Sequence, residues 1–354
     1  QDGCADPVEP RRGRPTWPTM QCSPHCTVSV IMPTAGRPEF VEHQLTRIAA
    51  QEAVEGGGST GRPVSEVIVV DDSPPALRVK SLVTNSITVI RGLRVNYLVL
   101  DRRASVGAKR NMAADAATGD VIAHWDDDDF YGSRRLGEQL RHIVQGAAVT
   151  VLPHQYTYLL PPDELYAAGS SVAKTQALSW GPHFGTLAYR RSLWKELGGF
   201  ADNSLGEDYH FAQRAKKRGA KLTVLKPSSG KSSREPLFVY VRTGVNTWNW
   251  TATGGGAKKN HLDPLHSHRV ADPRAMLSRA DAEFAARLRG GSLLGELAAR
   301  RTATGGPPNL REPDDLDPDF FYHLFRDADA RIATAGGGTC CADATCQRVV
   351  ACAR

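Results

Sequence analysis

The sequence predicts an α/β fold in which a mostly parallel sheet is flanked by helices. Apolar runs rich in β-branched residues, such as Val67–Val70, have the unbroken hydrophobic character of strands that are covered on both faces. These runs alternate with segments of helical periodicity, an order typical of parallel strands joined by right-handed crossovers. Polar clusters follow three of the runs, at residues 33–37, 71–72 and 126–129, and indicate a single ligand-binding edge.

The expected strands are the short apolar runs, in order residues 27–32, 66–70, 95–100, 120–125, 149–152, 186–191, 222–225 and 237–241. Helices are expected where apolar residues recur every three or four positions, at 38–48, 102–118, 135–144, 193–197, 207–218, 273–288 and 293–301. Gly119 closes the second of these helices, and the acidic pair Glu207-Asp208 begins the fifth. The Gly- and Ser-rich stretch 55–61 is expected to be a flexible surface loop, and residues 153–185 are expected to be loop and short strand that shape a binding site.

The composition is that of an ordinary globular protein, with 354 residues, 41% hydrophobic and 23% charged. The formal net charge is +6, but Lys and Arg are scattered rather than gathered into one block. We therefore expect anionic substrates such as phosphates and no nucleic-acid partner. No apolar run approaches the ~18 residues of a membrane span, and residue 1 does not begin a signal peptide, so we expect no transmembrane segment and a targeting segment that was removed or never existed.

The seven cysteines lie only in the two tails, at positions 4, 22, 26, 340, 341, 346 and 352. We favour disulfides, and with them a Golgi-lumenal or secreted protein; a zinc site around Cys22–Cys26 and a cytoplasmic location are the alternatives. Asn249 begins a formal glycosylation sequon. The expected organisation is a cysteine-containing arm at 1–26, a catalytic domain at 27–250, and a helical or irregular extension with the cysteine cluster at 251–354.

The acidic run Asp126–Asp129 directly follows an expected strand. Four adjacent carboxylates repel one another, and a hard divalent ion such as Mn²⁺ or Mg²⁺ takes oxygen ligands of this kind while keeping open positions for water and phosphates. A solvated acidic turn is the simpler interpretation of an isolated run. The position beyond a strand end favours the metal site.

Five motifs in this order resemble the inverting family 2 glycosyltransferases with the GT-A fold. They are Val30–Thr34, Val69–Ser73, Gly107–Asn111, Asp126–Asp128 and Gly206–Asp208. The resemblance covers about residues 27–250 and leaves the cysteine arm and the last hundred residues outside it.

The resemblance implies a role for each matching residue. Nucleotide-binding residues would be Pro33, Thr34, Arg37, Asp72, Lys109, Arg110 and Asp127. Asp126 and Asp128 would form the DxD-like pair that binds the metal, Mn²⁺ in the first place and Mg²⁺ as the alternative. Asp208 would be the base that activates the acceptor, and Glu207 would support the start of the helix or bind the acceptor.

Many related sequences carry a metal-binding His after the late strand, but here Thr243 follows it. That ligand is either absent or supplied by His261, His266 or His268, of which we choose His266. Trp180, His183, Trp248 and Trp250 could stack on sugar rings, although aromatic residues in such numbers are more often part of a core.

These observations predict a metal-dependent inverting glycosyltransferase. By family default the donor is a UDP-sugar, and the acceptor is a hydroxyl of a glycan, protein or lipid. The first alternative is a catalytically silent glycan-binding or scaffolding protein with the same fold. A sugar nucleotidyltransferase is the second, but residues 33–37 match its Gly-rich phosphate loop poorly.

Overall fold

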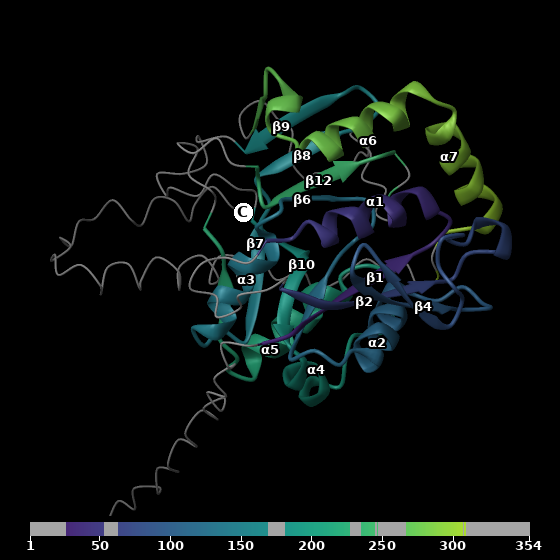
Figure 1. The fold of residues 1–354 in the computed structure, drawn as a ribbon. Coiled ribbons are helices and arrows are strands. Elements are labelled where there is room, and N and C mark those ends of the chain that lie inside the picture. The colour runs from purple at the N-terminus through teal and green to yellow at the C-terminus, as the bar shows by residue number, and fades with distance from the viewer. Residues whose placement is uncertain are drawn as a thin grey trace, which may run out of the picture. The chain divides into compact units, whose positions relative to one another are not determined.

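An eight-stranded sheet forms the centre of the computed structural model, in the order β11-β7-β10-β5-β1-β2-β4-β3 (Figure 1). Its strands are β1 (Val28–Thr34), β2 (Val64–Asp71), β3 (Ser86–Ile90), β4 (Leu93–Val99), β5 (Val121–His124), β7 (Val149–Pro153), β10 (Pro182–Arg190) and β11 (Leu222–Val224). Four neighbouring pairs are parallel, namely β1·β2, β1·β5, β2·β4 and β11·β7, whereas β10 runs antiparallel to β5 and β7, and β3 to β4. The predicted α/β fold with a mostly parallel sheet is confirmed.

The structure describes residues 26–52, 63–168, 181–226, 235–244, 246, 267–306 and 308. They belong to one unit, Gln1–Leu316, and the second unit, Asp317–Arg354, lies entirely outside them. Cys26 is buried and disulfide-bonded, and the other six cysteines also lie outside the described residues. The predicted cysteine-bearing extensions and the domain boundaries therefore stay predictions.

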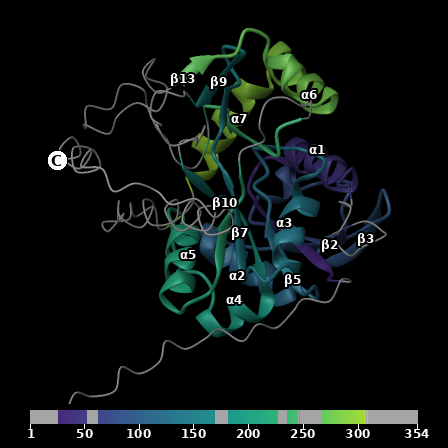
Figure 2. The ribbon, with the colours of Figure 1, turned by 90° about the vertical axis from the view of Figure 1, so that its left-hand side faces the viewer.

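Helices cover both faces of the large sheet, which explains its unbroken apolar strands. All seven residues of β1 are buried. In Figure 1 and Figure 2, α1 lies above β1 and β2, while α2 and α4 lie below them. The helices are α1 (Pro38–Ala49), α2 (Val106–Ala116), α3 (Arg135–Val144), α4 (Arg191–Leu197), α5 (Glu207–Lys217), α6 (Arg279–Gly290) and α7 (Leu293–Thr304). None of the described helices is both long enough and apolar enough to cross a bilayer.

A second, five-stranded sheet is paired in the order β13-β9-β8-β12-β6. Its strands are β6 (Phe130–Tyr131), β8 (Tyr156–Leu159), β9 (Glu164–Ala168), β12 (Phe238–Arg242) and β13 (Ser267–Arg269). Residues of this sheet share a hydrophobic core with α1, α6 and α7, including Phe40, Phe130, Val241, Phe284 and Leu297. The stretch 153–185, expected to be loop and short strand, supplies β8, β9 and the start of β10, and its residues 169–180 lie outside the described part.

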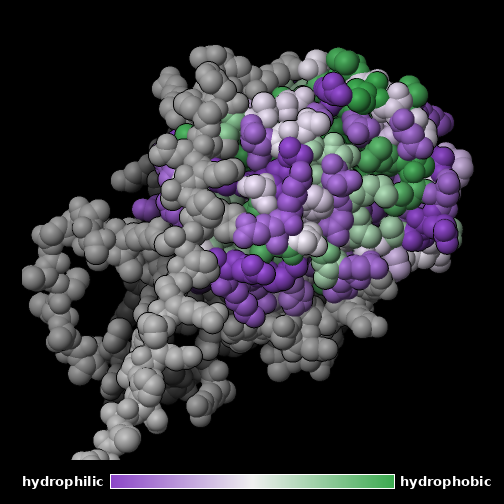
Figure 3. Space-filling view, turned by 90° about the horizontal axis from the view of Figure 1, so that it is seen from below, coloured by the Kyte–Doolittle hydropathy of each residue, from purple (hydrophilic) through white to green (hydrophobic). Residues whose placement is uncertain are grey.

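The edge strand β3 is the one large-sheet strand that the sequence reasoning missed. None of its five residues is fully buried, and Ser86 and Thr88 interrupt its apolar residues, so it does not have the unbroken apolar run of a covered strand. Val83, Ile87 and Val89 on and beside it are among the exposed large hydrophobic residues. Figure 3, a view from below, shows hydrophilic and hydrophobic residues mixed over the surface.

Candidate active site

The three polar clusters meet because the strands that carry them are neighbours and parallel. Thr34 at the end of β1 pairs in register with Asp71 at the end of β2, and Ile31 pairs with His124 at the end of β5. Carboxyl ends of parallel strands finish at the same sheet edge. The predicted convergence of residues 33–37, 71–72 and 126–129 is confirmed.

The four carboxylates of the acidic run divide into two pairs. Asp127 and Asp129 are each 1% exposed, whereas the side chains of Asp126 and Asp128 are 24% and 14% exposed. One oxygen of each exposed residue, Oδ2 of Asp126 and Oδ1 of Asp128, makes no hydrogen bond to a described residue. Alternate residues of the run therefore offer carboxylate oxygens to a ligand, and the other two are used inside the protein.

A buried side-chain amide and a strand of the second sheet hold the turn of the acidic run in place. Gln44 Nε2 donates to the carbonyl oxygens of Asp127 (3.1 Å) and Asp129 (2.8 Å), and Trp125 Nε1 donates to Gln44 Oε1 (2.7 Å). The carboxylate of Asp129 accepts the backbone N–H of Val241 (2.8 Å). These contacts leave the turn little freedom to rearrange.

Arg37 binds two members of the acidic run from the loop that follows β1. Its Nη2 lies 2.7 Å from Asp127 Oδ1 and its Nη1 2.6 Å from Asp128 Oδ2. Thr34 Oγ1 donates to Asp127 Oδ2 (2.6 Å), and Asn246 Nδ2 donates to Asp128 Oδ2 (2.9 Å). Burial raises the pKa of Asp127 to about 7 against the opposing effect of Arg37. Burial would lower the pKa of Arg37, but the two carboxylates raise it above its ordinary value.

Arg110 joins the acidic run to the start of α5. Its Nη2 lies 2.8 Å from Asp126 Oδ1, while its Nη1 contacts Glu207 and lies 3.4 Å from Asp208 Oδ2. Burial, the largest effect, raises the pKa of Glu207 to about 8, and Arg110 opposes it. Burial also raises the pKa of Asp126, and the neighbouring charge of Asp128 adds to this effect. One buried guanidinium therefore faces three carboxylates.

Lys109 links the second strand end to the first. Its Nζ donates to Asp72 Oδ1 (3.1 Å) and to the carbonyl oxygen of Thr34 (3.0 Å). Asp72 also accepts from Arg103 Nη1 (2.7 Å) and from the backbone N–H of Ala104 (2.9 Å). Burial lowers the pKa of Lys109, while Asp72 acts to raise it.

The rest of the Gly107–Asn111 motif holds the loop that precedes α5. A Cβ atom at Gly107 would lie 1.9 Å from the carbonyl oxygen of Ala201, so only glycine fits there. Asn111 Oδ1 accepts from Trp194 Nε1 (3.1 Å) and from the backbone N–H of Phe200 (2.7 Å). The motif thus places both Arg110 and the start of α5.

His183 lies beside the acidic run, at the start of β10. A Cβ atom at Gly185 would lie 2.7 Å from Asp126 Oδ2 and 3.2 Å from His183 Nδ1, so the glycine keeps space between these atoms. The imidazole packs against Phe238 and Tyr240 with 4.7 Å between ring centroids in each case. Burial lowers the pKa of His183 to about 4. The ring is neutral at pH 7.

The donor set at the acidic run fits a hard divalent cation. Asp126 and Asp128 have carboxylate oxygens that a metal could take as ligands, and a bound positive charge would relieve their mutual repulsion. Among the described residues, no three or more His, Cys, Asp or Glu side chains group closely enough to enclose a metal. Mg²⁺ and Mn²⁺ suit a site of one or two carboxylates completed by water and phosphate oxygens.

The model of the glycosyl transferase family 2 matches residues 29–211, slightly more than half of the chain. The chain belongs to this family. The match contains all three strand ends, the Gly107–Asn111 motif and the start of α5, and it ends before β12, α6 and α7.

Several solved structures are similar to this chain. S. aureus TarS is 19% identical, with 62% of this chain and 37% of the TarS chain covered and a TM-score of 0.42. TarS 1–349 in complex with UDP-GlcNAc is 18% identical over 61% of this chain and 58% of that chain, with a TM-score of 0.43. Mannosyltransferase PcManGT from Pyrobaculum calidifontis, in complex with GDP-Man and Mn²⁺, is 17% identical over 90% of this chain and 78% of that chain, with a TM-score of 0.41. The chain spans less than two thirds of the TarS chains, and no curated protein sequence matches it.

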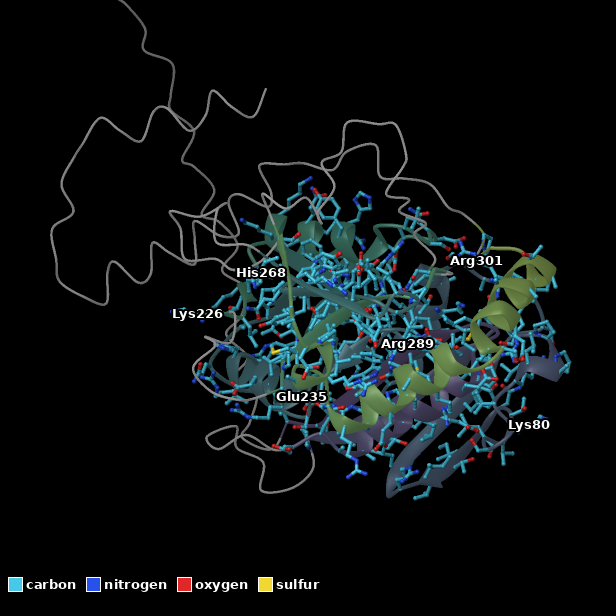
Figure 4. The ribbon with its side chains drawn as sticks, turned by 90° about the horizontal axis from the view of Figure 1, so that it is seen from above. Lys80, Lys226, Glu235, His268, Arg289 and Arg301 are labelled. Atoms are coloured by element: carbon cyan, nitrogen blue, oxygen red, sulfur yellow. The ribbon has the colours of Figure 1, made fainter. Side chains whose placement is uncertain are left out.

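The residues predicted from the family 2 motifs lie in two sets of contacts that the acidic run connects. The first set contains Thr34, Arg37, Asp72, Lys109, Asp127 and Asp128, and the second contains Arg110, Asp126, Glu207 and Asp208. Pro33 is buried in β1 beside Thr34. His266, His261, Trp180, Trp248 and Trp250 lie outside the described residues. His268 is exposed on the edge strand β13 (Figure 4).

Sequence reasoning missed Asn246, which lies three residues after Thr243, the position where a family 2 histidine was sought. Its Oδ1 accepts the backbone N–H of Thr243 (2.8 Å), and its Nδ2 reaches Asp128. A polar residue four positions beyond a strand end is a weak signal. Gln44 was missed as well, because a polar residue on the buried face of α1 interrupts the apolar pattern without indicating its partner.

Proposed function

We propose that this family 2 chain is a metal-dependent inverting glycosyltransferase. It would transfer a sugar from a nucleoside diphosphate sugar, with a UDP-sugar as the first donor to test, to a hydroxyl of a glycan, protein or lipid. The observation that carries the proposal is the position of Arg110, whose guanidinium contacts Asp126 of the acidic run and both Glu207 and Asp208 of α5. The candidate metal ligands and the candidate base therefore face one another across a single side chain.

The donor would bind at the three strand ends. Asp126 and Asp128 would hold Mn²⁺ or Mg²⁺, which neutralises charge on the leaving diphosphate. Arg37 lies against Asp127 and Asp128 and so adds a fixed positive charge beside the same site. Lys109 and Asp72 fix the loop after β1, where the nucleotide is expected.

Asp208 is the proposed general base. Its side chain is 19% exposed, whereas that of Glu207 is 4% exposed, so Asp208 is the more accessible of the two to an acceptor. An acceptor hydroxyl would give its proton to the Asp208 carboxylate while its oxygen attacks the anomeric carbon. Attack from the face opposite the leaving diphosphate inverts that carbon. Glu207 would support Arg110 from inside the protein.

The test is calorimetric titration of UDP into the purified chain with and without Mn²⁺, with GDP and CDP as controls, followed by an assay of UDP-sugar hydrolysis. We expect tight binding of one nucleotide that requires the metal. Asp208→Asn should keep this binding and lower transfer or hydrolysis by about 10²–10⁴-fold. If none of the nucleotides binds, the silent glycan-binding alternative replaces the enzyme.

We further propose that the chain works in an oxidising compartment such as the Golgi lumen or outside the cell. The disulfide of the buried Cys26 supports this location. Mass spectrometry of the native protein before and after reduction tests it, and seven free thiols in protein purified with thiol alkylation would exclude it.

A further inference from the structure

Helix α7, which lies beyond the family match, reaches the candidate donor site. Arg300 binds Glu39 at the start of α1 through both guanidinium nitrogens (3.0–3.1 Å), and its Nη1 also lies 3.4 Å from the carbonyl oxygen of Gly36. Arg301 Nη1 donates to the carbonyl oxygen of Asn246, the residue whose side chain binds Asp128. Figure 4 shows Arg301 on α7. The helix is therefore fixed to the loop after β1 and to the partner of the acidic run.

Charge is divided unequally between the two ends of the site. At one end Arg110 faces Asp126, Glu207 and Asp208, so carboxylates are in excess. At the other end, positive groups gather around Asp127 and Asp128, namely Arg37, Arg242 and Arg301.

Two of these three arginines make no ion pair with a described residue. Arg37 binds both carboxylates, whereas the guanidinium of Arg242 donates only to the hydroxyl of Tyr240 (2.9 Å) and lies over its ring. Arg301 has the Asn246 carbonyl as its described acceptor, and its Nε and Nη2 make no hydrogen bond to described residues. An arginine near the end of a helix commonly binds a backbone carbonyl. Arg301 also adds a third positive charge to the end of the site that contains Asp127 and Asp128.

We propose that Arg301 binds the diphosphate of the donor, with Arg242 beside it, so that α7 is part of the donor site. This inference rests on the proposed function. A guanidinium presents several N–H donors in one plane and suits phosphate oxygens, and a diphosphate brings the negative charge that this end lacks. Arg301 is partly exposed and can reach a ligand, whereas Arg242 is 8% exposed and would act chiefly through its charge.

The electrostatic surroundings of Arg301 agree with this role. Burial and the neighbouring charges of Arg37 and Arg242 lower the pKa of Arg301, and Asp128 only partly offsets them. A bound anion would relieve this repulsion.

The experiment compares Arg301→Gln, Arg301→Lys and the control Arg279→Gln with the wild type. Arg279 is 92% exposed on α6, so its substitution removes the same charge away from the site. Each protein is titrated in the presence of Mn²⁺ with UDP, GDP, inorganic diphosphate and uridine. Arg301→Gln should lower the affinity for nucleoside diphosphates and for inorganic diphosphate by about 10- to 100-fold, because charge-assisted hydrogen bonds are lost. It should leave the affinity for uridine unchanged. Arg279→Gln should match the wild type, and Arg301→Lys should show a smaller loss.

The outcomes separate this inference from the proposed function. Diphosphate affinities of a folded Arg301→Gln that equal those of the wild type overturn the inference and leave the function standing. If the wild type binds inorganic diphosphate but no nucleotide, the proposed function is wrong. The effect of Arg301→Gln on inorganic diphosphate affinity then still tests the inference. If the wild type binds neither, both fall. Thermal melting monitors folding, and if Arg301→Gln does not fold, an unchanged affinity of Arg301→Lys overturns the inference.

Discussion

Asp126 and Asp128 differ from Asp127 and Asp129 only in the side of the turn on which they lie, and this difference separates ligand binding from structure. The inner pair accepts hydrogen bonds from Thr34 and from the Val241 backbone, and each residue of the outer pair keeps one oxygen that no described residue binds. Sequence alone cannot assign members of an unbroken acidic run to these two tasks. The buried donors that assign them come from β1 and β12.

Substitution of Asp128 by Asn should therefore remove metal-dependent nucleotide binding without unfolding the protein. The Asn side chain can still accept from Arg37, which holds Asp128 Oδ2 at 2.6 Å, but it lacks the negative charge that a hard cation needs. We expect nucleotide affinity in Mn²⁺ to fall by about 100-fold. Loss of a residue that only supports a metal ligand already costs about 10- to 100-fold in metal affinity, and loss of the ligand itself should cost no less. Calorimetry in Mn²⁺ and in EDTA measures this effect. Asp115→Asn, on the exposed face of α2, is the matched control, and equal affinities of the two variants would remove Asp128 from the metal site.

Glu207 predicts a pH dependence of stability. Its pKa is raised by burial from 4.5 to about 8, so the folded protein holds a proton that the unfolded chain releases between these values. Stability from this group is present at low pH and is lost as the pH rises toward 8. Glu207→Gln has no carboxyl proton to lose. Its melting temperature minus that of the wild type should therefore increase as the pH rises from 5 to 9. Differential scanning fluorimetry measures the difference, with Glu196→Gln on the exposed part of α4 as the control. A difference that stays flat with pH would show that Glu207 is ionised throughout, paired with Arg110.

At the scale of elements, the strands and helices that carry the site were predictable because their signals are local. The stripe of Phe40, Val41, Leu45 and Ile48 predicted α1, and all four residues are buried. The apolar runs predicted β1, β2 and β5, and adjacency of parallel strands then placed three polar clusters together. The antiparallel direction of β10 was not predicted, because its apolar run reads the same in either direction.

The contacts of α6 and α7 could not be predicted, because they join residues far apart in sequence. His43 and Asp281 are separated by 238 positions, yet His43 Nε2 lies 2.7 Å from Asp281 Oδ1. Arg301 reaches Asn246 across 55 positions. Periodicity predicted both helices, but it identifies a buried face and not the surface against which that face packs.

Asp281 should be the principal polar attachment of α6. It is 2% exposed, receives His43 and lies 3.3 Å from Arg47 Nε on α1. Asp281→Ala leaves His43 without this acceptor and removes one of the two carboxylates beside Arg47, which keeps Glu235. It should lower the free energy of unfolding by about 3 kcal/mol. Urea denaturation measures the loss. Glu283→Ala, two residues further along α6, removes a carboxylate whose one ion pair among the described residues is with the exposed Arg279, and it should cost less than about 0.5 kcal/mol. Equal losses for the two variants would mean that Asp281 is not the principal polar attachment of α6.

At the scale of the described molecule, the two hydrophobic cores share α1. Its Val41 and Leu45 pack in the core of the large sheet, while Phe40 packs in the core that contains α6 and α7. A helix with buried residues in both cores couples them. We therefore expect the described unit to unfold as one cooperative body, with α6 and α7 included.

Phe284 tests this coupling. It is 4% exposed, stacks on His43 with 4.0 Å between ring centroids, and meets Phe40 edge to face at 5.2 Å. Phe284→Ala should lower the free energy of unfolding by about 3–5 kcal/mol while the transition stays single, with the same midpoint by far-ultraviolet circular dichroism and by tryptophan fluorescence. The control Met112→Ala, at a side chain that is 40% exposed on α2, should change stability by less than about 0.5 kcal/mol. A separate early loss of helical signal in Phe284→Ala, with the fluorescence transition unmoved, would show that α6 and α7 unfold independently of the large sheet. In that case α7 could leave the donor site without unfolding the sheet, and nucleotide should then protect the helix against melting.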